Sequence, residues 1–310
     1  MIRNVLSIAG SDPSGGAGIQ ADIKAISANG AYAMAVITAL TAQSTRGVTG
    51  VELVEADFVA EQIDALFADI RIDAVKIGML GSAGITIAVA DALARHRARK
   101  IVLDPVMVAK SGDRLLADDA VSALVTRLLP LAEVLTPNLP EAAVLLGVPE
   151  PTERGAMVDL AEELSRLGPR NVLLKGGHLP SGDSPDYLLT PDGGHWLEAP
   201  RLPTQNTHGT GCTLSSALAA QLAITSDVLV ASRRAKGYIA GAIARADRLR
   251  VGSGHGPTHH FHVLEEMRET IALLQLLAAG DRDIDLAEFE QAEAALDRLR
   301  ARLEAQRRWD

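Results

Sequence analysis

Residues 4–29 read NVLSIAGSDPSGGAGIQADIKAISAN, and this stretch indicates the fold. The run NVLSIA is largely apolar on both of its alternating faces, GSDPSGGAG is rich in glycine, and IQADIKAISAN places apolar residues at helical spacing. A strand that is apolar on both faces is typical of a parallel sheet with helices covering each side. The stretch therefore predicts a strand, a glycine-rich turn and a helix of an α/β protein.

The same alternation continues along the chain. Further strands are expected in residues 31–40, 74–79, 100–107, 134–138 and 171–177, and helices in residues 56–70, 82–98, 118–132, 139–147 and 154–168. Residues 187–200, YLLTPDGGHWLEAP, predict a hairpin at the sheet edge. This order predicts a three-layer, doubly wound α/β fold with a mostly parallel sheet.

Composition narrows the class of protein. The chain has 310 residues, one cysteine and a net charge of −9. A single cysteine cannot form an internal disulfide, which favours the cytoplasm. The acidic balance argues against nucleic acid as a partner, and the sequence contains no uncharged run long enough to cross a membrane. We therefore expect an enzyme or binding protein for a small molecule.

The only cysteine follows a second glycine-rich stretch. Residues 206–212 read NTHGTGC and lead into the apolar run TLSSALAAQLA. Backbone N–H groups freed by glycine at a helix N-terminus attract negative charge, and a thiol there is expected to have a lowered pKa. The alternative is that Cys212 is only a small buried residue.

Polar residues also follow several expected strands. Gln43 ends the second strand, and its amide could pair with a donor–acceptor edge of a heterocycle. Asp104, Asn138 and Glu141 offer oxygen atoms of the kind that Mg²⁺ prefers. Asn138 and Glu141 could equally cap the helix that begins at residue 139.

The first glycine-rich loop allows more than one interpretation. No Lys-Ser or Lys-Thr follows its glycines, so it is not a Walker loop. Residues 16–21, GAGIQA, do match a dinucleotide fingerprint, although the next strand lacks the acidic residue that would bind a ribose. The loop could also be a plain turn, with Asp22 a solvated acid in the first turn of the helix.

Taken together, these motifs resemble one family. The segments AGSDPSGGAGIQADIK, TALTAQST, KIGMLGS, VLDPVMVAKSG, LTPNLPEA, VLLKGGH, NTHGTGCTLSSA and GHGPTHHF occur in the order and spacing of the bacterial hydroxymethylpyrimidine/phosphomethylpyrimidine kinases of thiamine biosynthesis. These enzymes belong to the ribokinase-like superfamily. The resemblance covers residues 1–264 as a kinase domain, and we expect residues 265–310 to form a C-terminal helical extension outside it.

The resemblance implies an ATP- and Mg²⁺-dependent kinase, and a homodimer. It would phosphorylate 4-amino-5-hydroxymethyl-2-methylpyrimidine and then its monophosphate. The implied pyrimidine-pocket residues are Gly10, Asp22, Gln43, Met79 and Val106. The residues implied to lie beside Mg²⁺ are Asp104, Asn138 and Glu141. The residues implied to bind ATP are Lys175, Thr207 and Lys236. The implied catalytic residues are Gly209, Thr210, Gly211 and Cys212.

Three alternatives stay open at this point. A pyridoxal or pyridoxine kinase of the same superfamily would bind a similar ring that bears a hydroxymethyl group. A nicotinamide-dependent dehydrogenase would rest on residues 16–21 alone. A non-catalytic binding protein would have the tail as its working part.

Overall fold

The structure is a computed structural model that describes residues 1–107, 117–180 and 182–278, together with positions 290, 293, 294, 296, 297 and 300. It has two compact units, residues 1–260 and residues 261–310. The second unit contains helix α9 (His262–Ala278). The expected helical extension over residues 265–310 lies largely outside the described residues. No helix in the described part is long and apolar enough to span a membrane.

The first unit is built on one large, mostly parallel sheet, as the sequence predicts. Its strands are β10 (Gly193–Leu197), β9 (Asp186–Thr190), β8 (Asn171–Lys175), β7 (Val134–Leu135), β6 (Ile101–Leu103), β5 (Ala74–Ile77), β1 (Asn4–Ala9) and β2 (Tyr32–Ile37), in that spatial order. Strands β9 and β10 form the expected antiparallel hairpin at one edge. The confirmed fold class is therefore a doubly wound α/β sheet.

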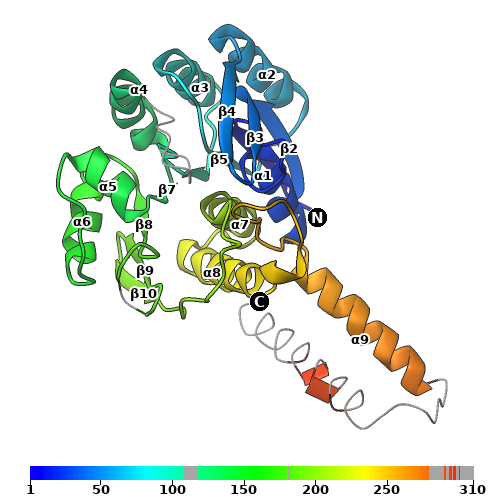
Figure 1. The fold of residues 1–310 in the computed structure, drawn as a ribbon. Helices are drawn as coiled ribbons and strands as arrows, with labels where there is room; N and C mark the ends of the chain where they lie inside the picture. Colours follow the sequence, from blue (N-terminus) through cyan, green and yellow to red (C-terminus); the bar gives the residue numbers. More distant parts are fainter. Residues whose placement is uncertain are drawn as a thin grey trace. The chain divides into compact units, whose positions relative to one another are not determined.

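Helices cover both faces of this sheet (Figure 1). One face carries α2 (Ala56–Asp69), α3 (Ala83–Arg95), α4 (Asp118–Ala123), α5 (Leu139–Leu146) and α6 (Ala156–Ser165); the other carries α1 (Gly18–Ala28), α7 (Thr210–Thr225) and α8 (Val228–Ala244). A π-helical turn (Leu124–Leu128) and two 3-10 turns (Leu129–Leu131 and Ala246–Arg248) complete the set. Alternate strand residues enter separate cores: Leu6 of β1 packs on the α2–α6 side and Val5 on the α7 side.

Helix α7 is apolar nearly all round, which explains its central position. It contacts α1 and α8 and also lies against β1, β5 and β6. Small residues such as Ala217, Ala219 and Ala220 are fully buried and allow this close packing. The N-terminus of α7 is thereby fixed beside the carboxyl ends of the parallel strands.

The second expected strand differs from the prediction. It ends at Ile37, and the chain then forms a separate two-stranded sheet of β3 (Ala39–Ser44) and β4 (Gly47–Leu53). The break falls at the buried Thr38, whose N–H donates to Ala9 and whose carbonyl accepts from Val54. Gln43 therefore lies on a hairpin beside the large sheet. Strand β4 was not predicted, because its sequence GVTGVEL contains two glycines and does not alternate regularly between apolar and polar residues.

Candidate active site

A large cavity of about 860 Å³ lies at the carboxyl ends of the parallel strands. This is where open α/β sheets bind their ligands. The sequence-predicted residues that line it are Gly10, Gln43, Met79, Asp104, Val106, Asn138, Glu141, Lys175, Thr207, Gly209, Thr210, Gly211, Cys212 and Lys236. Residues from the whole length of the first unit thus meet in one place. Asp22 is the one predicted site residue that is not part of the lining.

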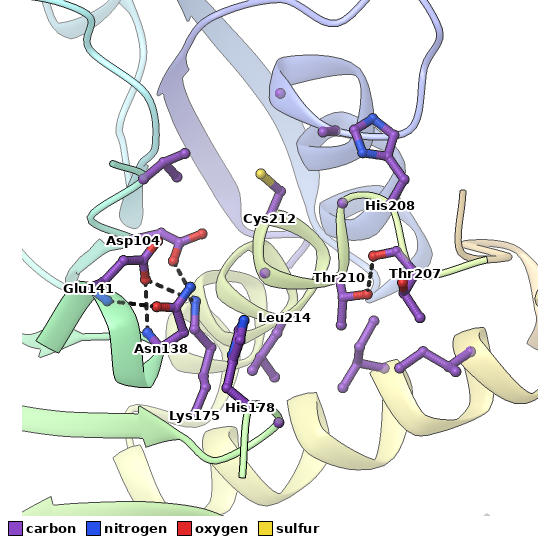
Figure 2. A pocket seen from close by; sticks show the side chains of 18 of the residues that line it. Asp104, Asn138, Glu141, Lys175, His178, Thr207, His208, Thr210, Cys212 and Leu214 are labelled. Carbon is purple, nitrogen blue, oxygen red and sulfur yellow. Dashed lines mark hydrogen bonds and ion pairs between the residues drawn. The ribbon is translucent and has the colours of Figure 1, made fainter. Parts of the chain in front are cut away.

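The anion loop, residues 207–212, forms the centre of the cavity wall. Gly209 caps α7 with a φ of 74°, a conformation that favours glycine. A Cβ at this position would lie 1.7 Å from the carbonyl oxygen of Gly16, so no larger residue fits. The Thr210 hydroxyl donates to the carbonyl of Thr207 at 2.7 Å (Figure 2). Helix α7 therefore points its first N–H groups into the cavity.

An aspartate and a histidine join the anion loop to the first glycine-rich loop. Nε2 of His208 lies 2.8 Å from Oδ2 of Asp12, which also accepts from the N–H of Ala17 at 2.8 Å. The other oxygen accepts from the N–H and the hydroxyl of Ser14. Burial by itself would raise the pKa of Asp12, but these hydrogen bonds, that from His208 foremost, lower it to about 2. Asp12 therefore stays ionised and only accepts, so Nε2 of His208 carries a hydrogen.

On the other side of α7, a mostly buried lysine pairs with an aspartate. Nζ of Lys175 donates to Oδ1 of Asp104 at 2.8 Å, and the Ser215 hydroxyl donates to Oδ2 at 3.2 Å. Burial opposes ionisation of Asp104, but Lys175 and then Lys76 keep its pKa below the usual value. The pair is therefore charged, with its ammonium at the cavity wall.

Asn138 and Glu141 cap helix α5, which is one of the two roles expected for them from the sequence. The side chain of Asn138 accepts from the N–H of Glu141, and Oε2 of Glu141 accepts from the N–H of Asn138, both at 2.8 Å. Burial raises the pKa of Glu141 to about 7, with Lys175 opposing the rise and Asp104 adding to it. Capping does not exclude a second role, because both side chains also line the cavity.

Whether these residues suit Mg²⁺ depends on the oxygens that remain available. The described residues contain no cluster of three or more histidine, cysteine or carboxylate groups arranged to hold a metal. Asp104 and Glu141 are both engaged by protein donors. The donor set therefore fits an ion held mainly by substrate phosphates and water, which is how Mg²⁺ is usually bound.

Gln43 reaches the cavity from strand β3. Its Oε1 accepts from the Thr41 hydroxyl at 3.3 Å, and its Nε2 lies 3.4 Å from Nε2 of His208. Since the hydrogen on that His208 nitrogen is directed at Asp12, His208 offers no acceptor to Gln43. The Gln43 amide therefore keeps its N–H donors for a ligand.

The pKa expected for Cys212 is wrong in direction. Burial raises the pKa of this thiol to about 11, although Lys76 acts against the rise. Asp22 and Asp104 lie near enough to add to it. The helix N-terminus does not overcome these effects, so at neutral pH Cys212 is a neutral thiol that lines the cavity.

The side chain of Asp22 lies outside the cavity lining and is fully buried, so Asp22 is not the solvated acid of the alternative interpretation. It forms an ion pair with Lys76 of β5 at 2.8 Å. Lys76 itself lines the cavity. Sequence reasoning missed Lys76, although a lysine within the apolar run AVKI was a usable signal. It also missed Asp12 and His208, which lie in the two glycine-rich motifs.

Lys236 of α8 also lines the cavity. Its Nζ donates to Oδ2 of Asp186 at 2.7 Å and to the carbonyl of Ser184 at 2.8 Å. Ile239, one turn further along α8, and Leu202 add apolar surface to the cavity wall. The cavity could therefore receive a flat, apolar group.

Comparison with known proteins points to one family. The family described as Phosphomethylpyrimidine kinase matches residues 12–259. A hydroxymethylpyrimidine/phosphomethylpyrimidine kinase of Escherichia coli (strain K12) is 53% identical over 259 residues, which cover 84% of this chain and 97% of that protein. The protein of the same name from Rhizobium meliloti (strain 1021) is 52% identical, with 84% and 98% covered.

Solved structures agree with this result. The crystal structure of phosphomethylpyrimidine kinase from Clostridium difficile 630 is 42% identical with a TM-score of 0.70, and the match covers 78% of this chain and 99% of that one. An ADP complex of Bacillus subtilis pyridoxal kinase is 32% identical with a TM-score of 0.78, covering 86% and 100%. The fold is thus shared with kinases of two different heterocycles.

Proposed function

Because the chain belongs to the phosphomethylpyrimidine kinase family, we propose that it transfers the γ-phosphoryl group of ATP to 4-amino-5-hydroxymethyl-2-methylpyrimidine and then to the monophosphate, in thiamine biosynthesis. The observation that carries this proposal is the anion loop, which opens into the same cavity as the Lys175–Asp104 pair. Phosphoryl transfer needs positioning and positive electrostatic potential more than a strong base. The N–H groups of the anion loop and the Lys175 ammonium would supply both.

The two ends of the cavity suit the two substrates. Gln43 offers amide donors to the pyrimidine edge, and Gly10, Met79 and Val106 form the surrounding wall. Lys236, Lys175 and Thr207 line the same cavity, and ATP would extend along them to the anion loop. The hydroxymethyl oxygen then meets the γ-phosphoryl group at residues 209–212.

The resting state of Cys212 limits its catalytic role. A thiol with a pKa of about 11 is not a thiolate base at neutral pH. In a loose transition state the attacking hydroxyl keeps its proton until late, so a strong base is not required. Cys212 therefore orients the hydroxyl by hydrogen bonding. Mg²⁺, held through water by Asp104, Asn138 and Glu141, would neutralise charge on the phosphates.

An ATP-consumption assay with three acceptors tests the proposal. We expect turnover with hydroxymethylpyrimidine and with its monophosphate. For Cys212→Ala we expect kcat to fall by about 10-fold to 10²-fold, no more than the roughly 10²-fold minimum for a general acid or base, because the neutral thiol only orients the hydroxyl. No ATP turnover with either pyrimidine would refute the function. Turnover of Cys212→Ala equal to the wild type would refute the role of the thiol.

Pyridoxal is the second candidate acceptor, because of the structural likeness to pyridoxal kinases. The higher sequence identity to the pyrimidine kinases favours the pyrimidine. Pyridoxal as the third acceptor decides this point: a kcat/KM above that of hydroxymethylpyrimidine would reverse the assignment. The family assignment excludes the dehydrogenase and the non-catalytic binding protein. In agreement, Gly16 of the fingerprint faces the ring of His208.

Two further parts of the proposal concern the setting of the enzyme. We propose that it acts in the cytoplasm, where a lone cysteine stays reduced. We also propose a homodimer, which the family resemblance suggests. Light scattering of the purified chain measures its mass in solution, and a monomer mass at micromolar concentration would overturn the dimer.

A further inference from the structure

Lys76 and Asp22 form a fully buried ion pair next to the cavity. Nζ of Lys76 donates to Oδ1 of Asp22 at 2.9 Å and to Oδ2 at 2.8 Å, and both side chains have no exposed surface. Buried ion pairs contribute little net stability, because apolar residues of similar volume are often as good or better. Stability alone therefore does not explain a lysine within strand β5.

The carboxylate is fully occupied by protein donors. The Ser7 hydroxyl donates to its Oδ2 at 2.6 Å and the Ser216 hydroxyl to its Oδ1 at 2.7 Å. With the two bonds from Lys76, this makes two donors on each oxygen. Asp22 has no capacity left for a ligand and acts as a fixed anchor for the ammonium.

The ammonium itself has capacity left. It has three N–H groups, two of which are directed at Asp22, and the third has no partner among the residues that the structure describes. Lys76 also lines the cavity. A Cβ at Gly78 would lie 2.7 Å from Nζ, so glycine at that position leaves room for the ammonium.

Cys212 lies on the face of helix α7 that is directed toward the Lys76–Asp22 pair. Cys212 and Ser216 are four residues apart on α7 and so share one face, and Ser216 contacts Asp22 directly. Gly211 and Ser215 face the other pair, Asp104 with Lys175. Figure 2 shows the Cys212 side chain pointing away from Lys175 and Asp104. The thiol is therefore associated with the Lys76 side of α7.

We propose that Lys76 is a positioning residue for phosphoryl transfer: held by Asp22, its ammonium orients the Cys212 thiol and offsets negative charge on the oxygens of the phosphoryl group in flight. This inference rests on the proposed function. In the step, the acceptor oxygen forms a bond to the γ-phosphorus while the bond to the ADP oxygen breaks and its electron pair leaves with ADP. The hydroxyl proton leaves late to a phosphate oxygen or water, and Lys76 keeps its proton throughout.

The test is the double variant Lys76→Met with Asp22→Asn, which leaves no charge buried alone. We expect kcat to fall about 10²-fold, as for loss of one electrostatic donor, with KM for ATP within about threefold of the wild type. Alkylation of Cys212, the only cysteine, should also require a higher pH than in the wild type. A purely structural role would change neither kcat at full occupancy nor the pH dependence of alkylation.

The matched control is Lys100→Met with Asp73→Asn, which makes the same charge change at the amino ends of β5 and β6. It should keep the wild-type kcat. A folded Lys76→Met/Asp22→Asn protein with kcat within about threefold of the wild type would overturn the inference. Absence of turnover in the wild type would instead overturn the proposed function, so the two failures are distinguishable.

A second measurement needs no change at Lys76, in case the double variant does not fold. A cation near the thiol favours the anionic reagent iodoacetate over neutral iodoacetamide. We expect the ratio of the two alkylation rates at Cys212 to exceed that of free cysteine, in the wild type and in Lys175→Met alike. Two results would overturn the inference. The first is a wild-type ratio at or below the ratio for free cysteine, and the second is a ratio in Lys175→Met that falls to the free-cysteine value.

Discussion

Replacing Asp12 by asparagine should make the free energy of unfolding less dependent on pH below about pH 4. The pKa of Asp12 falls from the usual 3.8 to about 2 in the folded protein. This difference of about 1.8 pKa units corresponds to at most about 2.4 kcal/mol of stability, at about 1.36 kcal/mol per unit. Because the folded pKa is the lower one, this stability is fully present above pH 3.8 and is lost as the pH falls through 2. The asparagine side chain would keep the shape but lose the charge-assisted bond to His208.

Urea unfolding at pH 7, 5, 4, 3 and 2.5 measures the effect. We expect Asp12→Asn to lower the free energy of unfolding by about 2 kcal/mol at pH 7, with the difference from the wild type shrinking below pH 4. Using this difference cancels the titration of other groups. Asp192→Asn, at an exposed turn, is the control and should show no such difference. A wild-type-minus-variant difference that does not vary with pH would refute the reasoning about Asp12 and His208.

Two further predictions concern the cavity wall. Gly209→Ala places a Cβ against the carbonyl of Gly16 at a positive φ, so we expect kcat in the ATP-coupled assay to fall more than about 10²-fold. The control is Gly237→Ala on α8, where a Cβ meets nothing. This control should leave kcat unchanged and raise the free energy of unfolding by up to about 1 kcal/mol. Folding raises the pKa of Glu141 from 4.5 to about 7, so between these pH values Glu141 takes up a proton when the protein folds. Its contribution to the free energy of unfolding should therefore fall as the pH rises from 4.5 to 7, by on the order of 3 kcal/mol. Urea unfolding of the nucleotide-free protein at pH 5 and 7.5 should show this slope reduced in Glu141→Gln, and an identical slope in the two proteins would contradict it.

The fold and the strand-end residues of the cavity could be predicted from the sequence for physical reasons. Strands buried on both faces are apolar throughout, and the helices between them show the 3.6-residue period. Parallel strands bring their carboxyl ends to one edge, so residues such as Asp104 and Asn138 converge although they are distant in sequence. Strand β4 lacked such a signal because water covers much of it.

The electrostatics of the site could not be predicted in the same way. The pKa of Cys212 depends on how much of its surroundings is apolar or anionic, and that is a property of packing. The sequence places Asp22 on a helix and Lys76 on a strand, but only the packing of α1 on α7 and β1, and of α7 on β5, brings them into a buried pair. His208 meets Asp12 across 196 positions, which local pattern does not reveal.

The enclosure of α7 has a consequence for the energy that ATP binding provides. Its residues from Thr213 to Ala220, with Leu222 and Ala223, are buried between the sheet and two helices, so their amides should exchange with solvent only when the whole first unit unfolds. The anion loop at its start is therefore in place before any ligand arrives. Little binding energy is then needed to order the loop, and more is left for alignment of the reacting oxygen with phosphorus.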